Sequence, residues 1–305
     1  MVNLRLQFPE NYFNEEVRDG YKVSADMKKV WAVELDLLNE FVQVCKKHNI
    51  QFFAAGGTLL GAVRHRGMIP WDDDIDVMML RSEYERLCKI APKEFLHPYF
   101  FQTEDTDPGS LRGHAQLRNS ETTGILNNDM DKGSKINQGI FIDIFPLDAV
   151  PENDSERKEL FLKIKRITNK FYEYNSYIHP YKFVIRKNLI ALCISTIKHF
   201  IISKEKAKQQ VLKLYRLKQE AICGTNMSSR KLLMSPFYVE RWVYDLEDFS
   251  SVLYLPFEMI EIPVPVGYEH ILTHTYGNWK KYVVGGSEHG GVFFDTDKPF
   301  TEYIK

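Results

Sequence analysis

The sequence predicts an α+β protein in which helices flank a mixed β-sheet core and a basic helical insertion interrupts the chain. Short apolar runs that end at glycine or proline alternate with segments whose apolar residues recur every three or four positions. The 305 residues suffice for a buried core, and 44% of them are hydrophobic, which excludes a disordered or fibrous chain. Positive charge is concentrated in one stretch, which predicts the insertion.

The first long helix is expected after Ser24 or Asp26, either of which can cap it. Apolar residues then recur at helical spacing, and Lys28 and Asp36 fall on the face predicted to point outward. The apolar set is Met27, Trp31, Leu35, Leu38, Val42 and Cys45. This helix should therefore pack one face against the core.

The following segments alternate between short strands and helices. We expect a strand over 51–55, a turn at Gly56-Gly57, a helix over 58–66 and a strand over 74–80. Ser82 and Glu85 have the spacing of a capping box for a helix that reaches about Phe95, and a β region begins at Tyr99. A further strand over 139–145 should end at Pro146. The sheet is thus assembled from short, separated strands.

Four aspartates stand within five positions, at Asp72, Asp73, Asp74 and Asp76. Strand alternation would direct Asp72, Asp74 and Asp76 to one face. Like charges about 4 Å apart repel by about 4 kcal/mol at an effective dielectric constant of 20, so such a cluster calls for cations or protonation. Oxygen ligands without nearby cysteine or histidine favour Mg²⁺ or Mn²⁺ over zinc.

A second acid lies within an apolar strand, because Asp143 interrupts the sequence Gly-Ile-Phe-Ile-Asp-Ile-Phe-Pro. A buried charge needs a partner, so Asp143 should meet either an arginine or a metal shared with the first cluster. Gly56 and Gly57 can let the backbone approach a phosphate, and the Thr58 hydroxyl can donate to it. Together these residues describe a phosphoryl-transfer site.

These motifs carry a resemblance to a known family. The blocks are Phe53-Ala-Ala-Gly-Gly-Thr-Leu-Leu-Gly61, Arg64-His-Arg-Gly67, Ile69-Pro-Trp-Asp-Asp-Asp-Ile-Asp-Val77 and Phe141-Ile-Asp-Ile-Phe-Pro-Leu-Asp148. They resemble the LicD family, which is similar in turn to the nucleotidyltransferase superfamily and to fukutin-related enzymes. Shorter matches at 116–123, 263–265 and 276–277 extend the resemblance over most of the chain.

The resemblance implies a nucleotidyltransferase-like core and metal-dependent transfer of a phosphorylated alcohol from a CDP-linked donor. The most familiar case is phosphocholine from CDP-choline, moved to a sugar of teichoic acid or lipopolysaccharide. The resemblance assigns metal binding to Asp74, Asp76 and Asp143, with Asp72 as a supporting ligand. The residues expected to meet the donor are Gly56, Gly57, Thr58, Arg64, Trp71, Arg118 and His289.

For several of these residues, an ordinary structural role is an alternative to contact with the donor. Arg64 can pair with the end of its own helix, Trp71 can wedge the start of the strand, and Arg118 is by itself an ordinary strand residue. His289 stands in a glycine-rich tail, where a flexible histidine without ligand contact is slightly favoured over contact with the donor. His270 and His274 have a spacing that could bind zinc, but without a visible third ligand a surface pair is expected.

Between residues 157 and 218 there are 16 Lys or Arg and 3 acids, a balance of +13, so the rest of the chain carries −14. We expect the catalytic core in 1–150, a basic helical segment in 151–235 and a segment that completes the core in 236–305. The basic helices either rest on anionic lipid or are merely solvated. No signature of nucleic-acid binding is present.

The four cysteines lie far apart and the N-terminus lacks a signal-peptide pattern, so we expect a cytoplasmic protein, peripheral at most at the inner face of the membrane. The expected partners are the CDP-linked donor and a glycan or lipid-linked glycan acceptor. Two other functions remain open from the sequence: a nucleotidyltransferase that transfers NMP from an NTP, and an inactive scaffold with the same fold.

Overall fold

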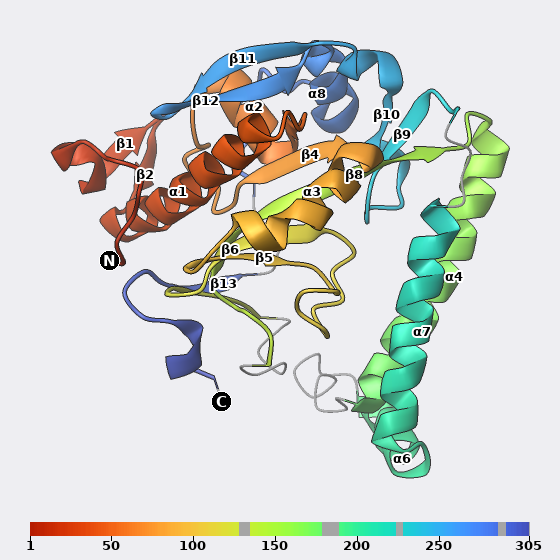
Figure 1. The fold of residues 1–305 in the computed structure, drawn as a ribbon. Helices are drawn as coiled ribbons and strands as arrows, with labels where there is room; N and C mark the ends of the chain where they lie inside the picture. The colour runs from red at the N-terminus through yellow and green to blue at the C-terminus, as the bar shows by residue number, and fades with distance from the viewer. Residues whose placement is uncertain (128–134, 179–188, 224–227, 286–290, 305) are drawn as a thin grey trace. The chain divides into compact units, whose positions relative to one another are not determined.

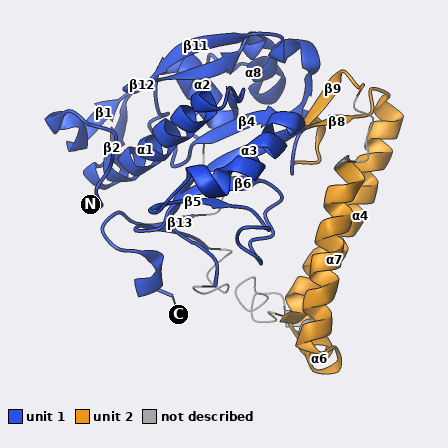
Figure 2. Cartoon of the chain, viewed as in Figure 1, with its two compact units in different colours: residues 1–147, 234–236, 241–305 blue, residues 148–233, 237–240 orange. Residues whose placement is uncertain are grey.

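The computed structural model describes residues 1–127, 135–178, 189–223, 228–285 and 291–304 (Figure 1). The chain divides into two compact units, shown in Figure 2. Unit 1 comprises residues 1–147, 234–236 and 241–305, and unit 2 comprises residues 148–233 and 237–240. The combination of helices with a mixed sheet confirms the predicted α+β class. The functional division expected at residues 150 and 235 stays a prediction.

The centre of unit 1 is a mixed β-sheet. Strand β3 (Phe53–Ala54) pairs antiparallel with β4 (Asp76–Leu80), and β4 pairs in parallel with β8 (Ile140–Val150). On its other side β8 pairs antiparallel with β6 (Ala115–Asn119), which pairs with β5 (Tyr99–Gln102). β8 leaves unit 1 after residue 147. The parallel β4–β8 pair brings together the starts of two strands that are far apart in the sequence.

Four helices of unit 1 accompany this sheet (Figure 1). Helix α1 (Ala25–Lys47) contacts β6, α3 (Arg81–Glu94) contacts β4 and β5, and α2 (Gly56–Arg64) contacts β4 and α8 (Tyr268–Tyr276). The smaller sheets are β1 with β2, β7 with β13 and β11 with β12. Their bounds are Glu16–Arg18, Tyr21–Val23, Thr123–Leu126, Val292–Asp295, Val252–Phe257 and Ile260–Pro265, and the short strands β9 and β10 span Lys231–Met234 and Val243–Asp245.

Helix α1 confirms the predicted helix and its cap, because the Ser24 hydroxyl accepts a hydrogen bond from Met27 N at 3.1 Å. The prediction that Lys28 and Asp36 point outward is wrong, since both are buried. Lys28 Nζ contacts Glu16 at 2.7 Å and lies over the Tyr12 ring. The segment before β1 therefore covers a face of α1 that the helical pattern alone assigns to solvent.

Several predicted boundaries are also wrong, and α2 spans Gly56–Arg64 rather than 58–66. β4 begins at Asp76 rather than at residue 74, so Asp72 and Asp74 lie in the preceding loop. α3 begins directly after Leu80, without a side-chain cap, and Ser82 lies inside the helix. β8 continues through Pro146, whose carbonyl accepts a hydrogen bond from Ser235 N at 3.0 Å. The neighbouring strand, rather than the residue type, decides where β8 ends.

Unit 2 consists mainly of three helices. These are α4 (Asp154–Ile178), α6 (Leu189–Ile201) and α7 (Lys204–Cys223). Helices α4 and α7 lie side by side along their lengths, and α6 also contacts α4 (Figure 1). Within the described parts of the chain, no helix combines the length and the hydropathy that crossing a membrane requires.

Asp36 gives a test of how the N-terminal segment is held on α1. Its Oδ1 accepts hydrogen bonds from Arg5 N at 2.8 Å and Leu6 N at 2.7 Å, and its Oδ2 accepts one from the Tyr99 hydroxyl at 2.7 Å. Asp36→Ala should lower the free energy of unfolding by about 2–3 kcal/mol, because three donors lose their acceptor. Urea unfolding measures this change. The control is exposed Asp26→Ala, which should cost less than about 0.5 kcal/mol, and equal losses in the two variants would contradict the assignment.

Candidate active site

The predicted acidic cluster is present, although a loop and not a strand carries most of it. One carboxylate oxygen from each of Asp72, Asp73 and Asp74 lies within 4.8 Å of the other two. Burial, followed by repulsion from Asp74, raises the pKa of Asp72 well above its usual range. Trp31, fully buried in α1, donates from Nε1 to the backbone carbonyl of Asp72 at 2.9 Å. The core helix thus fixes the backbone of the loop that bears the acids.

Asp76 and Asp143 occupy neighbouring strands at the same level. They are direct partners in the parallel β4–β8 pair, and Asp143 N donates to the carbonyl of Ile75 at 2.9 Å. Directly paired residues of adjacent strands project to the same face of a sheet. The register therefore puts Asp143 beside Asp76 on one face of the sheet, and a metal shared by the predicted carboxylates stays a prediction.

The diglycine turn lies against these acids. A Cβ on Gly57 would stand 2.4 Å from Asp72 Oδ2, and one on Gly56 would stand 3.0 Å from Asp76 Oδ2. Gly56 also has a φ of +48°, which side-chain-bearing residues rarely adopt. Both glycines are therefore required by the close approach of the carboxylates.

Thr58 connects the same turn to β4. Its hydroxyl oxygen accepts a hydrogen bond from Asp76 N at 2.7 Å, and the residue is buried. This bond holds the first turn of α2 against the start of β4. The predicted contact of Thr58 with donor phosphate stays a prediction beside this positioning role.

A series of polar side chains supports Asp143. Asp143 Oδ1 accepts a hydrogen bond from Gln116 Nε2 at 2.6 Å and contacts His114 Nε2 at 3.0 Å. Gln116 in turn accepts a hydrogen bond from Arg118, which is fully buried and also donates to the carbonyl of Gly139 at 2.6 Å. Arg118 thus lies beneath the site and orients Asp143 through Gln116. His114 was missed by the sequence analysis, because no local pattern distinguishes it.

Helix α8 adds a tyrosine to which the sequence analysis gave no role. The Tyr276 hydroxyl lies 3.9 Å from the Cβ position of Gly56. Burial, followed by the negative charge of Asp76, raises the pKa of Tyr276. The phenol is therefore protonated at neutral pH and can donate a hydrogen bond beside the acids.

Glu34 on α1 is a further residue that the sequence analysis missed. It is 1% exposed, and its pKa is raised well above the usual range by burial and then by the charges of Asp74 and the other clustered aspartates. Its Oε2 has no hydrogen-bond partner among the described residues. The helical pattern of α1 gave no sign that this acid faces the cluster.

Arg64 and Trp71 lie together in a group of rings at the end of α2. Arg64 lies 4.6 Å from the Tyr282 ring centre and donates from Nη1 to the Trp279 carbonyl at 2.8 Å. The His65 ring lies 5.2 Å from Tyr282 and 6.2 Å from Trp71. Burial, followed by Arg64, lowers the pKa of His65 to about 4, so its ring is neutral. Arg64 therefore holds the segment after α8, and its predicted contact with the donor stays a prediction.

The predicted site residue His289 lies outside the described residues, so its role also stays a prediction.

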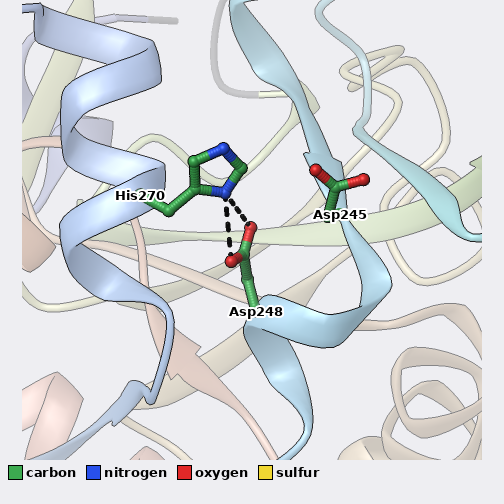
Figure 3. Close-up of side chains that lie close together, drawn as sticks. All are labelled: Asp245, Asp248 and His270. Carbon is green, nitrogen blue, oxygen red and sulfur yellow. Dashed lines mark hydrogen bonds and ion pairs between the residues drawn. The ribbon is translucent and has the colours of Figure 1, made fainter.

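A separate group links α8 to the segment before β11 (Figure 3). His270 Nδ1 contacts Asp248 Oδ2 at 2.9 Å, and each of Asp245, Asp248 and His270 places one ligand atom within 4.8 Å of the others. His270 was expected to pair with His274, but this group does not include His274. The contact ties the first turn of α8 to Asp248.

The donor set fits a hard divalent cation. Asp72, Asp73 and Asp74 bring carboxylate oxygens within 4.8 Å of one another, and Asp76 and Asp143 are strand partners in the adjoining sheet. Carboxylate oxygens are ligands of the kind that Mg²⁺ and Mn²⁺ prefer. Burial, followed by the charges of the neighbouring aspartates, raises the pKa values of Asp72 and Glu34. A bound cation would favour the charged form of these carboxylates.

The chain is similar to one family model and to several known proteins. Residues 49–189 match the family model described as LicD/FKTN/FKRP, nucleotidyltransferase domain. Over 249 residues the chain is 30% identical to the lipopolysaccharide cholinephosphotransferase LicD of Haemophilus influenzae, covering 81% of this chain and 88% of that protein. It is also 36% identical over 80 residues to an uncharacterized protein of Rickettsia prowazekii, covering 26% of this chain and 29% of that protein.

The fold and the cluster define an α+β protein with a carboxylate site beside a diglycine turn. The chain belongs to the LicD family.

Cation binding is testable by thermal unfolding. Mg²⁺ or Mn²⁺ should raise the Tm by about 2–6 °C, because ligands that bind only the folded state stabilise it. Without cations the Tm should fall as the pH rises, because the raised pKa of Asp72 means that the folded chain gives up this proton less readily than the unfolded chain. The cation-induced rise should therefore be larger at pH 8 than at pH 6.

Asp74→Asn is the matching variant. It should reduce the cation-induced rise while leaving the cation-free Tm unchanged or higher, because one repelling charge is removed. Exposed Asp105→Asn serves as the control and should retain the full rise. A full rise in Asp74→Asn would contradict its assignment as a ligand.

Gly57→Ala tests the close approach of the turn to Asp72. The added Cβ must displace the Asp72 carboxylate, so we expect Mn²⁺ affinity, measured by electron paramagnetic resonance, to fall about tenfold or more. The helical circular dichroism should not change. Gly285→Ala is the control, since nothing lies within 4 Å of its added Cβ. Wild-type affinity in Gly57→Ala would show that Asp72 takes no part in binding.

Proposed function

We propose that this chain transfers a phosphorylated alcohol, phosphocholine from CDP-choline, to a sugar hydroxyl of a cell-surface glycan precursor and releases CMP. The observation that carries the proposal is the placement of Asp76 and Asp143 as direct strand partners beside the diglycine turn. The similarity to a lipopolysaccharide cholinephosphotransferase supports the choice of headgroup and of acceptor class. Teichoic acid is the other acceptor that we consider.

The first turn of α2 would hold the donor phosphates. Ala55 at the N-cap has no polar side chain to satisfy the amides that follow it, and Gly56 and Gly57 let the acids lie close to the backbone of this turn. Helix N-termini attract anions through these amides and the helix dipole. Tyr276, protonated next to Asp76, can donate a hydrogen bond to a phosphate oxygen.

The acids would hold a divalent cation, with Asp74, Asp76 and Asp143 as ligands and Asp72 in support. When bound, such a cation neutralises the donor diphosphate and makes the acceptor hydroxyl more acidic. Gln116 and His114 hold the Asp143 carboxylate in place, and Trp31 holds the loop at Asp72. The geometry of the ligands is thus set before any substrate arrives.

In the transfer, the acceptor oxygen forms a bond to the phosphorus that bears the alcohol, and the bond from that phosphorus to the oxygen of the CMP phosphate breaks. The electron pair leaves with CMP. One carboxylate of the cluster accepts the hydroxyl proton. A lipid-linked acceptor would be presented to the enzyme at the inner face of the cytoplasmic membrane.

A donor panel tests the proposal. The purified chain is incubated with Mg²⁺, with lipopolysaccharide or teichoic acid, and with CDP-choline, CDP-ethanolamine, CDP-ribitol or ATP in turn. We expect CMP from CDP-choline and its disappearance on chelation of the metal. Pyrophosphate from ATP would instead favour a nucleotidyltransferase, and the absence of both products with every donor would favour an inactive scaffold.

Asp76→Asn should lower kcat/KM by at least about 100-fold, because the carboxylate acts on charge that develops in the transition state. Exposed Asp105→Asn should leave kcat/KM unchanged. Equal activity of the two variants would refute the role of Asp76.

A further inference from the structure

Helix α6 exposes an unusual number of large apolar side chains. Five of them are between 53% and 82% exposed, and we call them the apolar stripe: Ile190, Ile194, Ile197, Phe200 and Ile201. A helix on the surface of a globular protein normally turns such residues toward its core. In α6 these apolar residues are instead exposed.

The orientation of α6 is consistent along its length. With 100° between successive residues, the four isoleucines of the stripe fall within an arc of about 60°. Half-buried Leu192, Thr196 and His199 lie on the opposite side. His199 Nδ1 contacts the backbone carbonyl of Tyr177 in α4. α6 thus rests on α4 through its less apolar side.

Positive charge accompanies the stripe. Exposed lysines occur in α6 and at the start of α7, namely Lys198, Lys204, Lys206 and Lys208. Glu205 lies among them and contacts Lys208 at 3.7 Å. Residues 157–218 as a whole carry a balance of +13. An exposed apolar stripe on a helix that contains one lysine and is followed in the sequence by others is typical of helices that lie in the interface of an anionic bilayer.

We propose that α6 docks this protein on anionic lipid bilayers, with the apolar stripe inserted at the boundary between headgroups and acyl chains. Lys198 and the lysines at the start of α7 contact the lipid phosphates. Pairing of two α6 helices from two copies is disfavoured, because it would bring two segments of charge +13 together. This inference goes beyond the proposed transfer reaction and does not depend on it.

Vesicle flotation of the full chain tests the proposal. Vesicles of phosphatidylcholine alone are compared with vesicles that contain phosphatidylglycerol, in the absence of any donor. We expect recovery with the anionic vesicles and little with the neutral ones. Ile194→Asn combined with Ile197→Asn should reduce the recovery at least tenfold while helical circular dichroism is retained.

The matched control is a variant in which two exposed apolar residues of β11, Leu253 and Tyr254, are replaced by asparagine. This variant should float like the wild type. Equal recovery of the α6 variant and the wild type would overturn the proposal. So would equal recovery with neutral and anionic vesicles. A wild-type dimer that the α6 variant converts to a monomer, with unchanged flotation, would show that a second copy covers the stripe.

Cys193 provides a second measurement, because it lies in α6 and is an exposed free cysteine. An environment-sensitive fluorophore is attached to it in a chain whose Cys88 and Cys223 are replaced by serine. Its emission should shift to shorter wavelength on addition of anionic vesicles, and the shift should be absent in the Ile194→Asn, Ile197→Asn background. An unshifted emission during flotation would show that another surface binds the lipid.

Discussion

The parallel pairing of β4 with β8 is the interaction on which the candidate site depends. Asp76 and Asp143 are remote in the sequence and meet only through this register. Because side chains alternate between the two faces of a sheet, a slip of one residue would send Asp143 to the opposite face. β8 is held on its other edge by β6, and the Thr58 hydroxyl holds the start of β4. Neighbouring elements on both sides therefore maintain the register that the site requires.

The concentration of acids is costly in the folded chain, and neutral contacts maintain it. Trp31 binds a backbone carbonyl of the acidic loop, and Gln116 supplies an amide donor to Asp143. Such groups fix the carboxylates without cancelling their charge. Glu34 and Asp72 accordingly have raised pKa values, caused by burial and by the neighbouring acids. The surroundings thus disfavour the charged form of these two carboxyl groups, and a bound cation would favour it.

The sequence predicts the local features well, because these depend on residues close together in the chain. The cap at Ser24 and the glycine pair at the junction of β3 and α2 could be found in this way, whereas the pairing of Asp76 with Asp143 depends on contacts between distant strands. The prediction that Asp36 points outward was wrong because backbone hydrogen-bond donors of the N-terminal segment cover it. The predicted end of β8 came too early because Ser235 N donates a hydrogen bond to the Pro146 carbonyl. His114 and Tyr276 reach the site only through tertiary packing, which no local pattern records.

The contact between Gly57 and Asp72 makes these two positions one steric unit. An added Cβ at residue 57 would stand 2.4 Å from the carboxylate oxygen, so a larger residue there fits only if the side chain of residue 72 moves or becomes shorter. Substitutions at the two positions should therefore be strongly non-additive, with the pair better tolerated in folding than their separate effects suggest. A redesign of this turn therefore has to change residues 57 and 72 together.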